Sequence, residues 1–259
     1  MEMEASYNWF LVVLSFLISV FGAFTGLQMT NGMKASGKKF SWGWITAAAF
    51  ALGGGAIWTM HFIGMLAYQL PMDMGYDPWL TFLSLIVAVL AVGLGVATAV
   101  AGHLSWPRLL GAGVLTGLGV ASMHYIGMAA MVMPGEMHYD QGLVAVSIGI
   151  ALVAATVALW LAVNLKGTMQ ILLSAVVMAV AVCGMHYTGM VAMTMEHEPG
   201  AATNQVLGQG MAPMTMGLLV FCTSMVLLVL CLIASLSQLN QKMQEELGVL
   251  ETNVTAPSN

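Results

Sequence analysis

The chain has 259 residues, of which 59% are hydrophobic and only 7% are Asp, Glu, Lys or Arg. A soluble domain carries roughly 25% charged residues, so this composition excludes a water-soluble globular protein. Six Lys and Arg residues in a chain of net charge −5 make no basic patch, which excludes nucleic acid as a partner.

Apolar runs of about twenty residues recur along the chain and predict an all-α, polytopic membrane helix bundle in the lipid bilayer. Seven runs are present, so we expect seven transmembrane helices. Their expected ranges are 7–29, 43–70, 79–102, 108–133, 142–164, 168–194 and 213–236. Glu2 and Glu4 stand where a cleavable signal peptide would be basic, so we expect the first span to be retained.

Proline, glycine and charged residues mark the connectors, which we expect to be loops. The longer connectors are 31–41, 71–78, 134–141 and 196–212. Beyond the last span, Leu236, Met243 and Leu247 recur at helical spacing among polar residues. This pattern is typical of a helix that continues toward a partner, or of a solvated helix end. We expect one transmembrane domain over 1–240 and a cytoplasmic C-terminal tail over 241–259.

All six basic residues fall on the same side of the predicted spans. They are Lys34, Lys38, Lys39, Arg108, Lys166 and Lys242. Lys and Arg accumulate in the cytoplasmic loops of membrane proteins. The distribution therefore predicts that the N-terminus lies outside and the C-terminus in the cytoplasm.

The second, fourth and sixth spans each carry the motif Met-His-x-x-Gly-Met. The copies are Met60–Met65, Met123–Met128 and Met185–Met190. These spans all run in the same direction, so we expect the three histidines to lie at one depth. A histidine inside an apolar membrane span is costly and is usually functional.

The repeat extends beyond the motif. Pro71 and Pro134 follow the first two histidines at the same offset, and the dipeptides Tyr76-Asp77 and Tyr139-Asp140 follow in step. This register predicts internal repeats of a two-helix unit. If the helices end near these prolines, the histidines lie roughly 15 Å inside the outer helix ends.

Within each copy, the histidine and the second methionine are four residues apart and share a helix face. The predicted metal ligands are His61, His124, His186, Met65, Met128 and Met190. The methionines before each histidine lie about 100° around the helix and are expected to reach the site from its edge. These are Met60, Met123 and Met185. Thioethers select soft ions, above all Cu(I), so copper is the predicted metal, with zinc and haem as weaker alternatives.

Other interpretations of the three histidines stay open. They are compatible with purely structural contacts between helices, or with copper transport. Residues 43–56 and 108–120, the inner halves of two motif spans, contain no His, Met or Cys, which argues against a transport path. A membrane oxidase would need more His or carboxylate ligands, so we expect no enzymatic activity.

Met185-His186-Tyr187-Thr188 resembles the MHYT domain, a bacterial integral-membrane sensor module named after that tetrapeptide. The second copy reads Met-His-Tyr-Ile and the first Met-His-Phe-Ile, so the first Met, the His, the Gly and the second Met are kept in all three. The resemblance covers all seven predicted spans.

The resemblance implies a multi-pass sensor of the bacterial inner membrane that binds copper through the motif Met and His residues. It implies a response to a diatomic gas such as O2, CO or NO, to redox state or to copper itself. MHYT domains are commonly fused to cyclase, phosphodiesterase or kinase modules. This chain ends soon after its last predicted span. We therefore expect a cytoplasmic signalling partner contacted by the C-terminal helix, or a longer protein of which this is a part.

Overall fold

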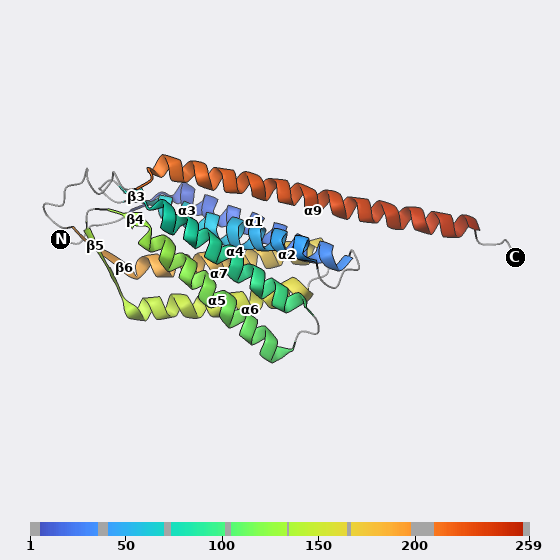
Figure 1. Ribbon diagram of the computed structural model, residues 1–259, viewed down its shortest axis with the longest axis horizontal. Helices are drawn as coiled ribbons and strands as arrows, with labels where there is room; N and C mark the ends of the chain where they lie inside the picture. Colours follow the sequence, from blue (N-terminus) through green and yellow to red (C-terminus); the bar gives the residue numbers. More distant parts are fainter. Residues whose placement is uncertain are drawn as a thin grey trace.

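A computed structural model describes residues 6–35, 41–69, 74–101, 105–133, 135–164, 167–197 and 210–255. Seven helices in this part of the chain are long and apolar enough to cross a membrane, as expected. They are α1 (Trp9–Ala35), the continuous α2 (Trp42–Ala49), η1 (Phe50–Trp58) and α3 (Thr59–Ala67), then α4 (Pro78–Val100), α5 (Trp106–Ala129), α6 (Gln141–Asn164), α7 (Thr168–Val191) and α9 (Pro213–Thr255). The protein is an all-α membrane bundle (Figure 1).

The first six spans form a ring in chain order. Each packs against the next, and α7 closes the ring against α1. The last helix, α9, lies outside the ring against α1 and the second span, and then runs on past the bundle (Figure 1). Its extra covering explains why the second span is 89% buried, whereas the other spans are at most half buried.

The middle of the second span is a π-helix, over Phe50–Trp58. It contains three consecutive glycines, and close neighbours occupy the space beside them. A Cβ on Gly53 would lie 2.7 Å from the Ala88 carbonyl oxygen of α4, and one on Gly55 would lie 2.8 Å from Leu227 of α9. Segments of π-helix are rare and often mark functional sites. Here the π-helix leads directly into the first motif copy.

Short antiparallel strand pairs tie the helices together at one end of the bundle, which we call the strand end. The pairs are β1 (Ser6–Tyr7) with β2 (Tyr68–Gln69), β3 (Gly75–Tyr76) with β4 (Met131–Val132), and β5 (Gly135–Tyr139) with β6 (Met193–His197). Most of these residues were expected to be loops or helix ends. The motif helices therefore stop earlier than expected, and the histidines lie only about one and a half turns, roughly 8 Å, from the helix ends.

The strand pairs define three copies of one unit, strand–helix–helix–strand. The units are unit 1 (6–69), unit 2 (75–132) and unit 3 (135–197). In each unit an Asn or Asp follows the first tyrosine, and its backbone N–H donates to the carbonyl of the alanine two residues after the motif. The acceptors are Ala67, Ala130 and Ala192, at 2.8, 2.7 and 2.8 Å. The donor residues are Asn8, Asp77 and Asp140. The predicted two-helix repeat is confirmed, and unit 1 is its third copy.

The same three residues also begin the next helix of each unit. The Asn8, Asp77 and Asp140 side chains accept hydrogen bonds from backbone N–H groups two or three positions later. A side-chain oxygen at this position satisfies one of the unpaired donors of a helix start. In each unit, one Asn or Asp therefore joins the two ends of the unit through its backbone N–H and caps the first helix through its side chain.

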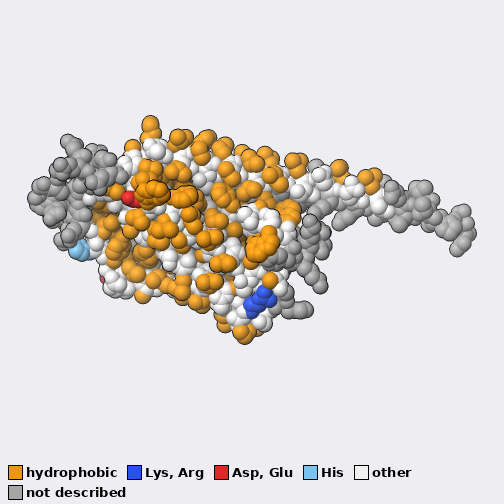
Figure 2. Space-filling view, viewed as in Figure 1, with side chains coloured by type: hydrophobic (Ala, Val, Ile, Leu, Met, Phe, Trp, Pro, Cys, Tyr) orange, Lys and Arg blue, Asp and Glu red, His pale blue; other side chains and the backbone are white. Residues whose placement is uncertain are grey.

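The surface suits a lipid environment. Hydrophobic side chains cover the flank of the bundle in Figure 2, with acidic and His side chains near the strand end and basic side chains toward the other. Exposed tryptophans stand at both ends, Trp9 and Trp79 at the strand end, Trp42 and Trp106 at the opposite end. Such aromatic belts are typical of membrane interfaces. Lys38, Lys39 and Lys166 lie outside the described residues.

Candidate metal centre

The three motif histidines meet inside the bundle, one from each unit. The distance between Nδ1 atoms is 3.0 Å for His61 and His186, 3.1 Å for His124 and His61, and 3.3 Å for His186 and His124. All three side chains are at most 1% exposed. Among the described His, Cys, Asp and Glu residues, these three form a group whose ligand atoms lie within 4.8 Å of one another. The histidines lie at one depth, as expected, and the structure shows in addition that they converge.

Hydrogen bonds alone cannot satisfy this triangle of nitrogen atoms. A neutral imidazole nitrogen either carries a proton or offers a lone pair, but not both. Of three Nδ1 atoms at 3.0 to 3.3 Å, at least two must therefore be in the same state. Between those two, either two lone pairs or two N–H groups face each other. Protonation would bury positive charge, which is costly in an apolar interior. A cation between the three lone pairs would resolve the conflict.

The motif glycines make room for the imidazoles in a cyclic order. A Cβ on Gly127 would lie 2.2 Å from Nε2 of His61. The equivalent distances are 2.2 Å from Gly189 to His124 and 2.3 Å from Gly64 to His186. Each histidine ring therefore lies against the glycine of the next unit, with unit 3 returning to unit 1. The three Nε2 atoms have no hydrogen-bond partner in the described part of the chain.

In the second and third motif copies, the tyrosine after the histidine links its unit to the following one in the same order. The Tyr187 hydroxyl lies 3.0 Å from Ser15 Oγ, and the Tyr125 hydroxyl contacts Ser147 Oγ. Each serine already donates to a backbone carbonyl three residues earlier, so the tyrosine is the donor between them.

The first motif copy has Phe62 at this position, which has no hydroxyl. Trp58, one turn earlier, takes over the role, and its Nε1–H donates to Ser84 Oγ at 3.0 Å. The loss of tyrosine in this copy is therefore compensated. The three serines were not among the predicted site residues. Each serine lies eight residues after the first tyrosine of its unit, which was the available signal. It was hidden because Tyr7-Asn8 was not recognised as the counterpart of Tyr76-Asp77 and Tyr139-Asp140.

Tyrosines at the strand end add a second ring of contacts between units. The rings of Tyr7 and Tyr187, Phe62 and Tyr76, and Tyr125 and Tyr139 lie edge to face at 6.0 to 6.1 Å. Burial, and then the neighbouring Tyr68 and Tyr187, raise the pKa of Tyr7 to about 12. Burial also raises the pKa of Tyr76 and Tyr139. These hydroxyls therefore stay neutral at physiological pH.

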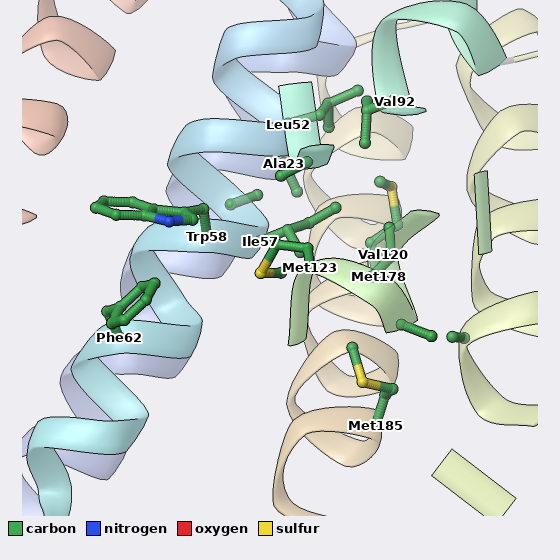
Figure 3. Close-up of a cluster of buried hydrophobic side chains, with 14 of the residues drawn as sticks. Ala23, Leu52, Ile57, Trp58, Phe62, Val92, Val120, Met123, Met178 and Met185 are labelled. Carbon is green, nitrogen blue, oxygen red and sulfur yellow. The ribbon is translucent and has the colours of Figure 1, made fainter. Parts of the chain in front are cut away.

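The motif methionines are fully buried with the histidines. Met65, Met128 and Met190 are 0 to 1% exposed, and so are Met60, Met123 and Met185. Figure 3 shows Met123 and Met185 among apolar side chains that include Ile57 and Val120. Ligation by the six thioethers stays a prediction.

Removing the Tyr125 hydroxyl tests the links between units. We expect Tyr125→Phe to lower the free energy of unfolding in detergent by about 1 kcal/mol, because Ser147 loses its donor. A double-mutant cycle with Ser147→Ala should show that the two changes are not additive. Tyr139→Phe is the control, since among the described residues its hydroxyl bonds to the Met137 sulfur of the same strand, at 3.9 Å. Additive losses would contradict the link.

The sequence matches a family model described as bacterial signalling protein N-terminal repeat (MHYT) at residues 54–112 and 117–175. The first match contains His61 and the second His124. The third copy, at 185–190, lies outside the matched residues.

Several curated signalling proteins are similar to this chain. A bifunctional diguanylate cyclase/cyclic di-GMP phosphodiesterase of Pseudomonas aeruginosa is 36% identical over 255 residues, which cover 96% of this chain and 36% of the relative. A cyclic di-GMP phosphodiesterase of the same species is 36% identical over 205 residues, covering 76% of this chain and 26% of the relative. A signalling protein of Bacillus subtilis is 35% identical over 205 residues, covering 75% of this chain and 25% of the relative. No solved structure matches. The chain thus spans about a third or less of these relatives.

Proposed function

Because the chain belongs to the MHYT family, we propose that it is a membrane sensor that holds copper between His61, His124 and His186. The observation that carries the proposal is the triangle of Nδ1 atoms, 3.0 to 3.3 Å apart and fully buried. Three nitrogen ligands at 2.0–2.1 Å from an ion in their plane are about 3.5 Å apart, so a small outward shift of each ring would admit one.

The donor set favours copper over the alternatives. Met65, Met128 and Met190 share helix faces with the histidines, and thioethers favour Cu(I), whereas zinc sites use Cys, His and carboxylate. Haem suits the geometry poorly, because imidazole nitrogens within 3.3 Å of one another leave no slot for a flat macrocycle. All nine motif Met and His residues belong to the proposed site, with Met60, Met123 and Met185 at its edge.

Elemental analysis tests the metal. Protein purified in lipid nanodiscs from cells supplied with copper, zinc and iron should carry about one copper per chain. The oxidised form should show an electron paramagnetic resonance signal with nitrogen couplings, and reduction should abolish it. Protein that carries zinc alone, haem alone or no metal would overturn the copper assignment.

The last helix is the proposed output. α9 packs against α1 and α3, and Leu227 fills the space beside Gly55 of the π-helix. A change in ligand or redox state at the metal would move α3, and α9 would carry the shift past the bundle. The stimulus we propose is O2, CO, NO or a redox change, and the recipient is a cytoplasmic signalling partner or a following segment of a longer chain.

The proposed orientation places the strand end outside the bacterial inner membrane. The basic residues of the described helices, Lys34, Arg108 and Lys242, lie toward the opposite end, while Asp77 and Asp140 lie at the strand end. A membrane-impermeant thiol reagent applied to intact spheroplasts should label Asp140→Cys and spare Arg108→Cys, in a background without Cys222 and Cys231. The reverse pattern would invert the topology.

A further inference from the structure

A cavity of about 60 Å³ lies on the axis of the helix ring, on the side of the histidines away from the strand end. All six ring spans contribute to its wall, and Figure 3 shows part of that wall. Alanines of α6 leave much of the space, among them Ala151 and Ala155. Small side chains thus keep the centre of the ring open.

The cavity approaches the histidines to within one helical turn. Ile57, Val120 and Val182 each stand four residues before a motif histidine, about 6 Å along the helix, and all three line the cavity. Met185, the neighbour of His186, lines it too. One layer of apolar side chains therefore lies between the cavity and the imidazoles.

The wall is suited to an apolar guest. A buried water needs two to four polar partners, whereas the wall offers only two hydroxyls, Ser19 and Thr116. Thr116 already donates to the Ala91 carbonyl, and Ser19 Oγ has no partner among the described residues. An apolar cavity of about 150 Å³ stays dry and binds benzene or xenon. A volume of about 60 Å³ suits a guest of diatomic size and excludes a lipid tail.

A lipid-facing groove between α6 and α7 leads to this cavity. It is lined by exposed residues such as Val153 and Val177, which are 66% and 55% exposed. Ala154 and Met178 belong to both the groove and the cavity. These two side chains therefore separate the bilayer core from the centre of the ring. Small apolar molecules concentrate in hydrocarbon, so the bilayer would supply them to this groove.

We infer that the bundle contains a binding site for a small apolar molecule of diatomic size, reached from the bilayer between α6 and α7. The site places its guest beneath the histidine cluster. It deepens the proposed sensor function, and its purpose as a gas site rests on that function. Binding in the cavity itself requires no metal, so the two ideas can fail separately.

Xenon is the probe for the cavity. Metal-free protein in nanodiscs, labelled at Met and Ile methyl groups, should show saturable shifts at Met185 and Ile57 as xenon pressure rises. Ala155→Leu fills the space and should weaken this response by at least about tenfold. Ala145→Leu, at an exposed position of the same helix outside both the cavity and the groove, is the control and should leave it unchanged. No saturable shift in the wild type, or an equal shift in Ala155→Leu, would overturn the site.

Exchange kinetics test the route. Ala154 stands between the groove and the cavity, so Ala154→Leu should slow xenon exchange several-fold. Ala155→Leu, which fills the cavity itself, should instead remove binding. Unchanged exchange in Ala154→Leu would overturn access between α6 and α7. Dissolved oxygen, which is paramagnetic, should speed relaxation of the same methyl groups. Positive xenon results with no copper in the elemental analysis would leave the cavity standing and the metal proposal refuted.

Discussion

Replacing His124 by alanine is expected to strip the protein of copper. The three imidazoles are the nitrogen donors of the proposed centre, and their Nδ1 atoms all lie within 3.3 Å of one another. Loss of a supporting residue around a metal typically costs 10–100-fold in affinity, so loss of a ligand should cost more than about 100-fold. Elemental analysis should find less than about a tenth of the wild-type copper.

His138→Ala is the matched control. His138 is exposed on β5 and lies outside the cluster, so its removal should leave the copper content unchanged. Folding is checked by thermal unfolding and by gel filtration of the nanodiscs. If folded His124→Ala keeps its copper, the histidine triangle is not the site. If His138→Ala loses it, the metal lies at the strand end instead.

Gly127→Ala is expected to disrupt the proposed metal site, although Gly127 is not itself a proposed ligand. A Cβ there would lie 2.2 Å from Nε2 of His61, closer than atoms can approach. The imidazole would have to tilt, and Nδ1 at its other side would leave the triangle. Overpacking of this kind costs about 1–3 kcal/mol. We expect Gly127→Ala to lower both the copper content and the unfolding temperature.

Gly184 provides the control for this substitution. It lies two residues before His186 on α7, and a Cβ there would meet nothing within 4 Å. Gly184→Ala should therefore keep the copper and stabilise the helix by about 0.5–1 kcal/mol, through reduced backbone entropy. In the double variant Gly127→Ala/His61→Ala, the clash is gone, so stability should recover while copper stays absent. A Gly127→Ala protein with full copper content would refute the role of the glycine.

The helices and the motif were predictable because each depends on local signals. A membrane span needs about twenty apolar residues whatever its neighbours do. The expected start of each span therefore falls within two residues of the observed helix start. The spacing of His61 and Met65 likewise needs only helix geometry to place both on one face.

Other features depend on partners far away in the chain. The strands β2 and β4 are only two residues long and too short to show a strand pattern in the sequence, and they form because each meets the first residues of its unit. The π-helix forms where Gly53 lies against α4 and Gly55 against α9. The copy at Tyr7-Asn8 escaped notice because Asn stands in place of Asp. Its equivalence shows in the backbone hydrogen bond from Asn8 to Ala67 and in the Asn8 side chain that caps α1.

By itself, the sequence determined that this is a seven-span membrane protein with three equivalent histidines on parallel helices. Apolar length and helical spacing are properties of short segments, which explains why these features need no tertiary information. Only the tertiary structure decided that the histidines meet through Nδ1, and that each ring needs the glycine of the next unit. It also placed an apolar cavity one turn beneath them. These features arise from the cyclic packing of three units, in which every contact joins residues from different copies.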